Sequence, residues 1–241
     1  MPADATIAKL VEKQMRNWEL SRQQRVGLQE EGEQRQVADF VSISREVAAG
    51  GRRFATALAE RLGWPVFDKE LLTHMADDDQ VRARLYEHMD ERDTGWIERM
   101  LRWLVQGEVR REDYVLRLSE TVLALARQSH AVFLGRGAEL ILPQDRGLRL
   151  RLIAPEDVRL REYARRSGCD EKAARSQLGR LERERAEYIR RTFGRDPAEL
   201  ARFDLILNLG SVALTDAVEL AMAALRLRGV AVDSQQASDS G

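Results

Sequence analysis

Arginines and glycines occur together at several places in this chain, in arrangements that suit the binding of phosphate groups. In residues 44–53, SREVAAGGRR, two adjacent glycines precede two arginines. Glycine lets the backbone approach a ligand closely, and arginine offers N–H donors in a planar fork that matches phosphate oxygens. The apolar run at 40–43 is typical of a buried strand, and Phe54, Leu58 and Leu62 recur at helical spacing. A strand, a glycine turn and a helix N-terminus together predict an anion-binding loop.

The same loop has a second interpretation, an ordinary strand-to-helix turn in which the paired glycines only relieve backbone strain. The full phosphate-loop signature, G-x-x-x-x-G-K-[ST], is absent because the segment contains no lysine and lacks the first glycine. These residues alone leave both interpretations open.

Two further candidate ligand residues follow short apolar runs. Arg136 lies between Gly135 and Gly137, directly after the run at 131–134, and Asp68 ends a shorter run. Open α/β sheets bind ligands at the C-terminal ends of their strands, so both side chains are well placed for a ligand. The alternatives are a salt-bridged turn for Arg136 and a helix N-cap for Asp68.

Arginine is also abundant in two helical segments predicted at 158–166 and 170–192. Most of these arginines must be solvated or paired with neighbouring glutamates, and a few are candidates for a mobile lid that closes over phosphates. Contact with RNA is a further interpretation. It is disfavoured because the chain carries 39 basic and 40 acidic side chains, and a nucleic-acid binder would carry a basic excess.

These residues are held by a predicted alternation of strands and helices. The expected strands lie near Phe40, Val66, Val132, Leu150 and Leu205. Strands that alternate with helices predict an α/β fold, with a parallel five-stranded sheet flanked by helices and right-handed crossovers.

The chain between 77 and 128 is predicted to be helical and charged, with breaks near 93–95 and 106–107. Three large side chains of the segment between these breaks share one helical face: Trp96, Met100 and Trp103. They predict packing in the core or under a lid, and stacking on a nucleotide base is a less favoured alternative.

The ends of the chain are predicted to differ from its body. Residues 1–38 form a helical extension and linker, 39–228 the body, and 229–241 a disordered tail. The extension carries an apolar stripe, made of Ile7, Leu10, Val11, Met15 and Trp18. The stripe must pack against the body of the same chain or against a second copy, so a homodimer through this helix stays open.

Composition excludes several classes of protein. The single cysteine, Cys169, excludes an intrachain disulfide and suits a reducing compartment. No apolar run approaches about 18–20 residues, so we expect a soluble cytoplasmic protein without membrane contact. His74 and His88 have no partners at metal-ligand spacing, and no metal ligand is assigned.

The chain resembles the cytidylate kinase-like branch of the P-loop nucleoside monophosphate kinases. The resemblance begins with the segment VSISREVAAGGRRFATALAERLGWPVFDKELL, because S-R-E, a Gly-Gly-Arg turn and a strand ending in Tyr/Phe-Asp-Lys recur in that branch. It continues in FLGRGAELILPQDRGLRLRLIAPEDVRLREYARR, where a Gly-Arg turn precedes a strand and an arginine-bearing helix. Further on, RERAEYIRR is similar to the Arg-x-x-x-Asp-x-x-Arg lid motif. The resemblance covers residues 39–228 apart from much of the insert at 77–111.

This resemblance implies an ATP-dependent transfer of a phosphoryl group to a nucleoside monophosphate, CMP or dCMP above all, with Mg²⁺. It implies ATP contacts from Ser44, Arg45, Glu46, Ala49, Gly50, Gly51, Arg52, Arg53 and Arg159. It implies acceptor contacts from Asp68, Arg136, Gly137 and Glu187. Catalytic cations are implied at Arg52, Arg183 and Arg190.

The chain departs from the family pattern where phosphates bind. The lysine of the loop is missing, and either Gly51 or Arg52 takes its place, depending on the register. Arg53 replaces the Ser or Thr that normally binds Mg²⁺, and the usual D-G-R-D turn keeps neither acid around Arg136. Two hypotheses therefore stand, an active kinase and a nucleotide- or phosphate-binding regulatory protein without turnover.

Overall fold

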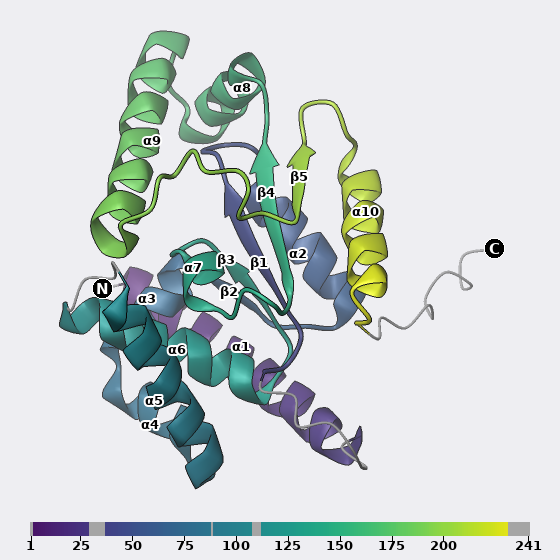
Figure 1. Cartoon of the computed structure of the whole chain (residues 1–241). Helices are drawn as coiled ribbons and strands as arrows, with labels where there is room; N and C mark the ends of the chain where they lie inside the picture. Colours follow the sequence, from purple (N-terminus) through teal and green to yellow (C-terminus); the bar gives the residue numbers. More distant parts are fainter. Residues whose placement is uncertain (1, 29–36, 88, 108–111, 231–241) are drawn as a thin grey trace.

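A computed structural model describes residues 2–28, 37–87, 89–107 and 112–230 of the chain. Five parallel strands form one sheet in the order β2-β3-β1-β4-β5 (Figure 1). The strands are β1 (Phe40–Arg45), β2 (Val66–Asp68), β3 (Ala131–Leu134), β4 (Leu148–Ile153) and β5 (Leu205–Asn208). The predicted α/β fold, with a five-stranded parallel sheet flanked by helices, is confirmed.

The central strand β1 pairs with β3 on one side and with β4 on the other. Ile43 lies opposite Leu134 in β3 and opposite Leu150 in β4. All three side chains are buried, as expected for strands covered on both faces. The chain leaves β1 toward β2 on one side and reaches β4 on the other, so the strand order reverses beside β1. Ligands of open α/β sheets bind at this type of position, outside the carboxyl ends of the strands.

Helices cover both faces of the sheet and enclose two apolar cores. On one face lie α2 (Gly51–Leu62) and α10 (Leu214–Leu227). On the other face lie α1 (Pro2–Leu28), α3 (Lys69–Asp77) and α6 (Asp113–Gln128), together with the short α7 (Ala138–Ile141). No helix in the described part of the chain is both long enough and apolar enough to span a membrane.

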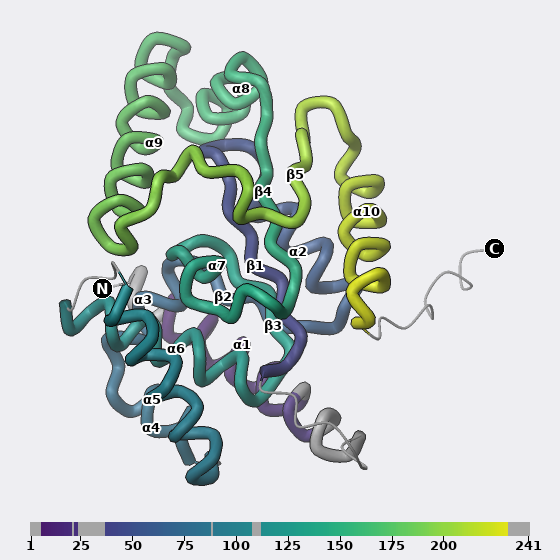
Figure 2. Tube along the Cα trace, in the orientation of Figure 1, coloured from purple at the N-terminus to yellow at the C-terminus, as the bar shows by residue number. Residues whose placement is uncertain are grey.

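Two helices stand together beyond the carboxyl ends of the strands, α8 (Glu156–Ser167) and α9 (Glu171–Phe193) (Figures 1 and 2). A small third core joins them to the loop after β1, since Val47 packs with Leu160 of α8 and with Ala174 and Leu178 of α9. The predicted arginine-rich helical pair is therefore anchored to the predicted phosphate loop.

The helical insert after α3 differs from the prediction in one respect. It forms α4 (Asp79–Tyr86) and α5 (Glu91–Gln106), and α5 runs without interruption through the predicted break at 93–95. This prediction is wrong because Asp90 caps the helix, accepting a hydrogen bond from the backbone N–H of Asp93, and Gly95 is tolerated inside it. The predicted break at Gly107 is confirmed. Trp96 is buried as predicted, whereas Trp103 is 56% exposed and does not belong to the core.

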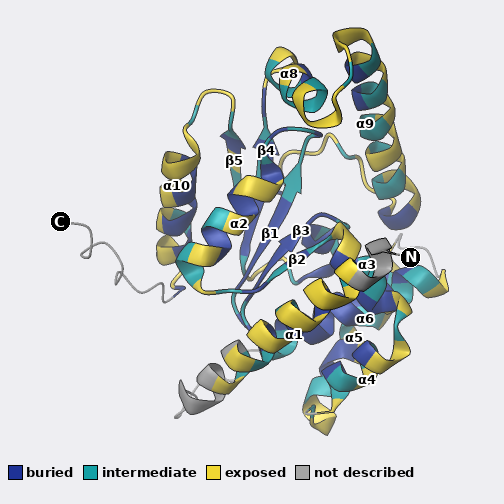
Figure 3. Cartoon of the chain, turned by 180° about the vertical axis from the view of Figure 1, so that it is seen from behind, coloured by how far each residue is buried: buried dark blue, intermediate teal, exposed yellow. Residues whose placement is uncertain are grey.

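The apolar stripe of α1 packs against the body of its own chain, and Figure 3 shows the opposite face of the helix exposed. Val11, Met15 and Trp18 are buried, and the indole Nε1 of Trp18 donates to the carbonyl oxygen of Leu125 at 3.2 Å. Leu10, also assigned to the stripe, is exposed. A homodimer through α1 would therefore have to use its outer face. The predicted linker at 29–36, and the tail from residue 231 onward, lie outside the described residues.

Replacing Trp18 with alanine is expected to lower the free energy of unfolding by about 3–5 kcal/mol, because it leaves a large cavity and removes the hydrogen bond of the indole. Urea unfolding followed by far-ultraviolet circular dichroism measures the change. Leu20→Ala on the exposed side of the same helix is the matched control, with an expected change within about 0.5 kcal/mol. Equal effects of the two substitutions would contradict the packing of α1 on the body.

Candidate functional site

The loop between β1 and α2 presents backbone N–H groups at the carboxyl edge of the sheet. Ala48 and Gly50 have positive φ angles of 60° and 83°, which curl the loop in the manner of an anion-binding concavity. The first hydrogen bond of α2 runs from the N–H of Phe54 to the carbonyl of Gly50. The N–H groups of Gly51, Arg52 and Arg53 are therefore left without partners inside the helix.

The charge at the start of α2 is the opposite of what a helix normally favours. A helix N-terminus carries a partial positive charge, which acidic side chains usually balance. The first turn of α2 has no acidic residue and carries Arg52 and Arg53 instead. An anion bound at this end would offset both the helix dipole and the two guanidinium groups.

Arg45 extends from the end of β1 underneath this loop. A Cβ atom added at Gly51 would lie 2.7 Å from its Cγ, and one added at Gly135 would overlap its Nη1. Both glycines are therefore needed for the arginine to lie between the two turns. Desolvation by burial, assisted by Arg185, lowers the pKa of Arg45, but a guanidinium stays charged at neutral pH. Arg45 forms no ion pair with any residue that the structure describes.

Further cations from separate elements face the same region. Desolvation lowers the pKa of Lys69, the first residue of α3, and the charges of Arg136, Arg185 and Arg45 lower it further. Arg185 of α9 donates from Nη1 to the carbonyl oxygen of Arg45 at 3.0 Å. We call these four residues, Arg45, Lys69, Arg136 and Arg185, the cation cluster. Their charges repel one another, and the nearby carboxylates of Asp68, Glu70 and Glu139 offset part of this repulsion.

Arg136 is held in a fixed position by uncharged partners. Its own φ is 57°, in the left-handed region between Gly135 and Gly137. Its Nε and Nη2 both donate to Oγ1 of Thr73, at 3.2 and 2.8 Å, and its guanidinium lies 5.7 and 5.1 Å from the ring centres of Tyr114 and Tyr188. Arg136 makes no ion pair with the described residues, so the salt-bridged turn is not what the structure contains. Its positive charge is therefore not neutralised by a carboxylate of the described residues.

We call Thr73, Tyr114 and Tyr188 the frame of Arg136. The hydroxyl of Tyr188 also donates to the carbonyl oxygen of Arg136 at 3.4 Å. Burial raises the pKa of Tyr188 to about 12, so the hydroxyl keeps its proton at neutral pH. Gly137 is needed for a separate reason, since a Cβ there would overlap the ring of Phe193.

The carboxylate of Asp68 already accepts hydrogen bonds from other groups of the protein. Its Oδ1 accepts from the backbone N–H groups of Glu70 and Leu71, which is the N-cap that the sequence offered as an alternative. Its Oδ2 accepts from Nη2 of Arg52 at 2.8 Å, and Glu70 lies 3.5 Å from the same guanidinium. The Arg52 side chain, 68% exposed, thus bridges the loop to the start of α3.

Three other predicted ATP ligands connect the loop to its surroundings. Ser44 accepts from Nη1 of Arg151 at 2.7 Å. Glu46 accepts from the N–H of Ala154 at 3.0 Å and lies 3.3 Å from Nε of Arg159. Nη1 of Arg159 in turn donates to Glu182 at 2.8 Å, and the same Glu182 oxygen accepts from the N–H of Val47. In this structure Glu46 and Arg159 bind each other rather than facing the loop opening.

The predicted lid residues lie on the other side of α9 from the site. Arg183 and Arg190 are exposed, and Glu187 forms an ion pair with Arg191. The structure brings Arg185 and Tyr188 to the site instead. The signal that identifies them is the stripe in which they continue the buried positions of α9 at helical spacing: Ala174, Leu178, Leu181, Arg185, Tyr188 and Thr192.

A pocket of about 460 Å³ opens on the side of the loop that faces α8 and the segment before α10. Ala49, Gly50 and Arg53 form its loop side, and Leu209 and Val212 are among the residues opposite. Small-molecule sites occupy about 300–1,000 Å³ and are mostly apolar with a few polar groups. Its size and its position beside the N–H groups of the loop suit a nucleoside.

The described residues contain no group of three or more His, Cys, Asp or Glu side chains that would hold a metal ion. Mg²⁺ bound to a nucleotide is commonly held by phosphate oxygens, waters and one or two carboxylates, so it does not require such a group.

Comparison with known proteins identifies the relatives of this chain. Residues 40–211 match the cytidylate kinase-like family. A search of curated proteins returned no match.

Among solved structures, an uncharacterized protein from Eubacterium ventriosum matches with a TM-score of 0.63 and 22% identity, over 80% of this chain and 99% of that one. Shikimate kinases from Acinetobacter baumannii and Bacteroides thetaiotaomicron match with TM-scores of 0.41 and 0.44 and identities of 17% and 14%. They cover 80% and 78% of this chain, and 96% and 98% of their own lengths. The likeness to the Eubacterium ventriosum protein concerns the fold alone.

Proposed function

Because the chain belongs to the cytidylate kinase-like family, we propose that it transfers the γ-phosphoryl group of ATP to a nucleoside monophosphate, with CMP or dCMP as the first acceptors to test. In this reaction an acceptor phosphate oxygen attacks the γ-phosphorus, the bond to the β–γ bridging oxygen breaks, and ADP leaves. Such a transfer requires positioned cations and the exclusion of water.

The observation that carries this proposal is the cation cluster. Arg45, Lys69, Arg136 and Arg185 come from four different elements and converge at the carboxyl edge of the sheet, coupled to one another electrostatically. Arg45 and Arg136 form no ion pair with a described residue. A fold bears the repulsion of such a cluster when a polyanionic ligand balances it, and two phosphate chains meeting end to end are such a ligand.

The donor nucleotide is proposed to bind on the α8 side of the loop. The pocket of about 460 Å³ there would take the nucleoside, with Arg53 in its wall. The N–H groups of Gly51, Arg52 and Arg53 would then bind the phosphates at the positive end of α2. Ser44 and Glu46 would support the loop from below rather than touch ATP, because both are engaged with other residues.

The acceptor is proposed to bind on the side of α3 and α6, beside Arg136. Thr73 and the two tyrosines fix the guanidinium before any ligand arrives, which reduces the entropy lost on binding. Asp68 would act through Arg52, holding that cation between the donor and the acceptor.

Lys69 is proposed to supply the lysine charge that the loop lacks. The lysine of a phosphate loop belongs to the turn after the first strand, whereas Lys69 follows β2. Its position at the start of α3 nevertheless places its charge near the other members of the cation cluster. A lysine is a compact charge with three donors, which suits a phosphoryl group whose oxygens move during transfer. Mg²⁺, when bound, would neutralise charge on the phosphates, and the chain would contribute few ligands to it.

Arg159, Arg183, Glu187 and Arg190 would take part only if α8 and α9 shift toward the loop. Arg183, Glu187 and Arg190 lie on the other side of α9 from Tyr188, so α9 would also have to rotate about its axis to bring them to the site. Lids of this kind exclude water and complete the site when substrate binds.

A regulatory protein that binds nucleotides without turnover is the second candidate. The observation in its favour is the loop itself, where Arg52 replaces lysine and is paired with Asp68. A guanidinium held by Asp68 would still bind phosphate. Its planar, fixed geometry would adapt poorly to phosphoryl oxygens that move during transfer.

The two functions are separated by measuring ADP release from ATP and Mg²⁺ against a panel of ribo- and deoxyribonucleoside monophosphates. A kinase is expected to release ADP only with an acceptor, and Arg52→Ala is expected to lower kcat/KM by about 10²-fold. The matched control is Arg102→Ala on the exposed face of α5, which removes an arginine distant from the loop. Calorimetric binding of ATP is measured on the same samples.

Acceptor-dependent ADP release that falls in Arg52→Ala and persists in Arg102→Ala would support the kinase. ATP binding that Arg52→Ala weakens, without ADP release for any acceptor, would support the regulatory protein. Absence of both ADP release and nucleotide binding would contradict both functions.

A further inference from the structure

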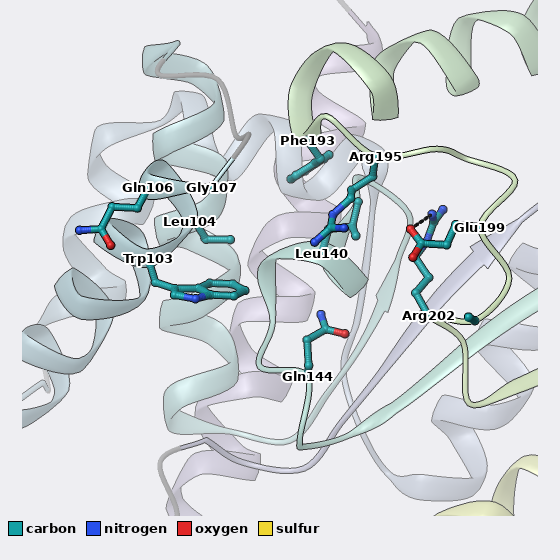
Figure 4. A pocket seen from close by; sticks show the side chains of 11 residues that line it. Trp103, Leu104, Gln106, Gly107, Leu140, Gln144, Phe193, Arg195, Glu199 and Arg202 are labelled. Atoms are coloured by element: carbon teal, nitrogen blue, oxygen red, sulfur yellow. Dashed lines mark ion pairs between the residues drawn. The ribbon is translucent and has the colours of Figure 1, made fainter.

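A second pocket, of about 560 Å³, lies between the end of α5, α7 and the segment that follows α9 (Figure 4). Trp103 and Leu104 of α5, Leu140 of α7, and Phe193 and Arg195 are among its lining residues. It shares no lining residue with the pocket beside the loop. Nothing in the proposed phosphoryl transfer uses it.

Trp103 gives this pocket a flat aromatic wall. The side chain is 56% exposed, whereas Trp18 and Trp96 are buried in the core. Figure 4 shows the indole lying along one side of the cavity, across from Arg195 and Leu140. An exposed tryptophan beside Leu104, Leu140 and Phe193 offers a stacking surface for a planar ring, with apolar walls around it.

The pocket also has one unbalanced charge, and it is positive. Arg202 is engaged, because its Nη1 donates to the carbonyl oxygen of Asp196 at 2.6 Å and lies 3.9 Å from Glu199. Arg195 forms no ion pair with any described residue, and its side chain reaches over Leu140 toward the cavity (Figure 4). The carboxylate of Glu199 faces Arg202 and so does not neutralise Arg195.

We propose that this pocket binds a small molecule in which a planar aromatic ring carries an anionic group. The ring stacks on Trp103, between Leu104 and Leu140, and the anion pairs with Arg195. A nucleotide and an aromatic carboxylic acid share this chemistry, and the cavity volume accommodates either.

The pocket borders the frame of Arg136 through one residue. The ring of Phe193 abuts Gly137 and meets Tyr188 edge to face, with 6.1 Å between the ring centres. An occupant therefore touches a side chain that packs against the frame of the proposed acceptor site, without entering that site.

The test is isothermal titration calorimetry of the full chain with three probes: 1-naphthoate, its uncharged analogue 1-naphthalenemethanol, and AMP. The variants are Trp103→Ala, Arg195→Gln and the control Arg102→Gln, which removes an exposed arginine from the same helix as Trp103. Trp103 and Arg195 are both exposed, so their replacement is expected to leave the fold intact, and circular dichroism checks this.

Wild type is expected to bind 1-naphthoate more tightly than 1-naphthalenemethanol. Trp103→Ala is expected to weaken binding of 1-naphthoate by roughly tenfold or more, and Arg195→Gln by about threefold to fivefold, whereas Arg102→Gln leaves it unchanged. A component of AMP binding that disappears in Trp103→Ala identifies the natural ligand as a nucleotide. AMP binding that Trp103→Ala leaves unchanged, beside the loss of 1-naphthoate binding, identifies an aromatic acid.

Three results would overturn the proposal. The first is that neither 1-naphthoate nor AMP shows binding that depends on Trp103, at concentrations up to about 1 mM. The second is equal binding of 1-naphthoate and its uncharged analogue, which removes the role of the anion. The third is a loss of 1-naphthoate affinity in Arg102→Gln that equals the loss in Arg195→Gln. Such a result would assign the effect of Arg195 to general surface charge.

Discussion

Lys69→Met is expected to lower kcat/KM of the proposed kinase by about 10²–10³-fold, the usual cost of removing one group that stabilises charge in a transition state. Lys69 is exposed enough that the substitution costs little in folding. The matched control is Lys172→Met in the first turn of α9, which is exposed and has no part in the cluster. Unchanged activity in Lys69→Met would show that Lys69 takes no part in phosphoryl transfer.

The pH dependence gives this prediction a second readout. Desolvation and three neighbouring cations lower the pKa of Lys69 below its ordinary 10.5 in the folded state. As pH rises through that lowered pKa, the folded protein loses the proton before the unfolded chain does, so the free energy of unfolding rises. Activity is expected to fall over the same range, because the neutral amine no longer attracts phosphate. Lys69→Arg is expected to move the alkaline fall in kcat/KM to higher pH.

Gly135→Ala is expected to lower kcat/KM by about 10²-fold, although the residue itself has no side chain to lose. Its φ of 86° costs a residue with a Cβ about 1–2 kcal/mol, and that Cβ would overlap Nη1 of Arg45 and lie 3.1 Å from its Cζ. The guanidinium would be pushed out of the cluster. Arg45→Gln is expected to reduce activity to a similar extent.

A matched glycine separates backbone strain from the displacement of Arg45. Gly63 has a φ of 67° at the end of α2, and a Cβ there would meet nothing within 4 Å. In urea unfolding, Gly63→Ala is expected to lower the free energy of unfolding by about as much as Gly135→Ala does. It is expected to keep its activity. Loss of activity in both glycine variants would assign the effect to strain alone, and retention of activity in both would remove Arg45 from the site.

Much of the fold follows from local sequence, because the strands are short apolar runs between clear turns. β3 is apolar at every position and β1 begins with Phe40, Val41 and Ile43, as expected where both faces of the sheet are covered. The loop, the glycines on either side of Arg136 and the N-cap role of Asp68 are also local, so they are predictable. The break expected near Gly95 fails because one glycine costs only about 1 kcal/mol in a helix that Asp90 caps well.

The site is less predictable, because its members meet only through tertiary packing. Thr73, Tyr114 and Tyr188 hold Arg136 from three different helices, and no spacing in the sequence joins them. On α9 the resemblance to the lid motif predicted site roles for Arg183 and Arg190. In the structure Arg185 and Tyr188, which continue the buried stripe of the same helix, lie at the site instead. Arginine and glutamate surround that stripe, so the contrast between its polar and apolar faces is weak.

The packing of α1 has a consequence for the order in which the protein forms during synthesis. The indole of Trp18 hydrogen-bonds to Leu125, which lies 107 residues later in the chain. At about 5–20 residues per second, a ribosome needs about 5–20 s to make the partner that covers this helix. Over that time Val11, Met15 and Trp18 leave the ribosome without the surface that buries them. The nascent chain therefore presents an amphipathic segment suited to transient capture by a chaperone until α6 has been translated.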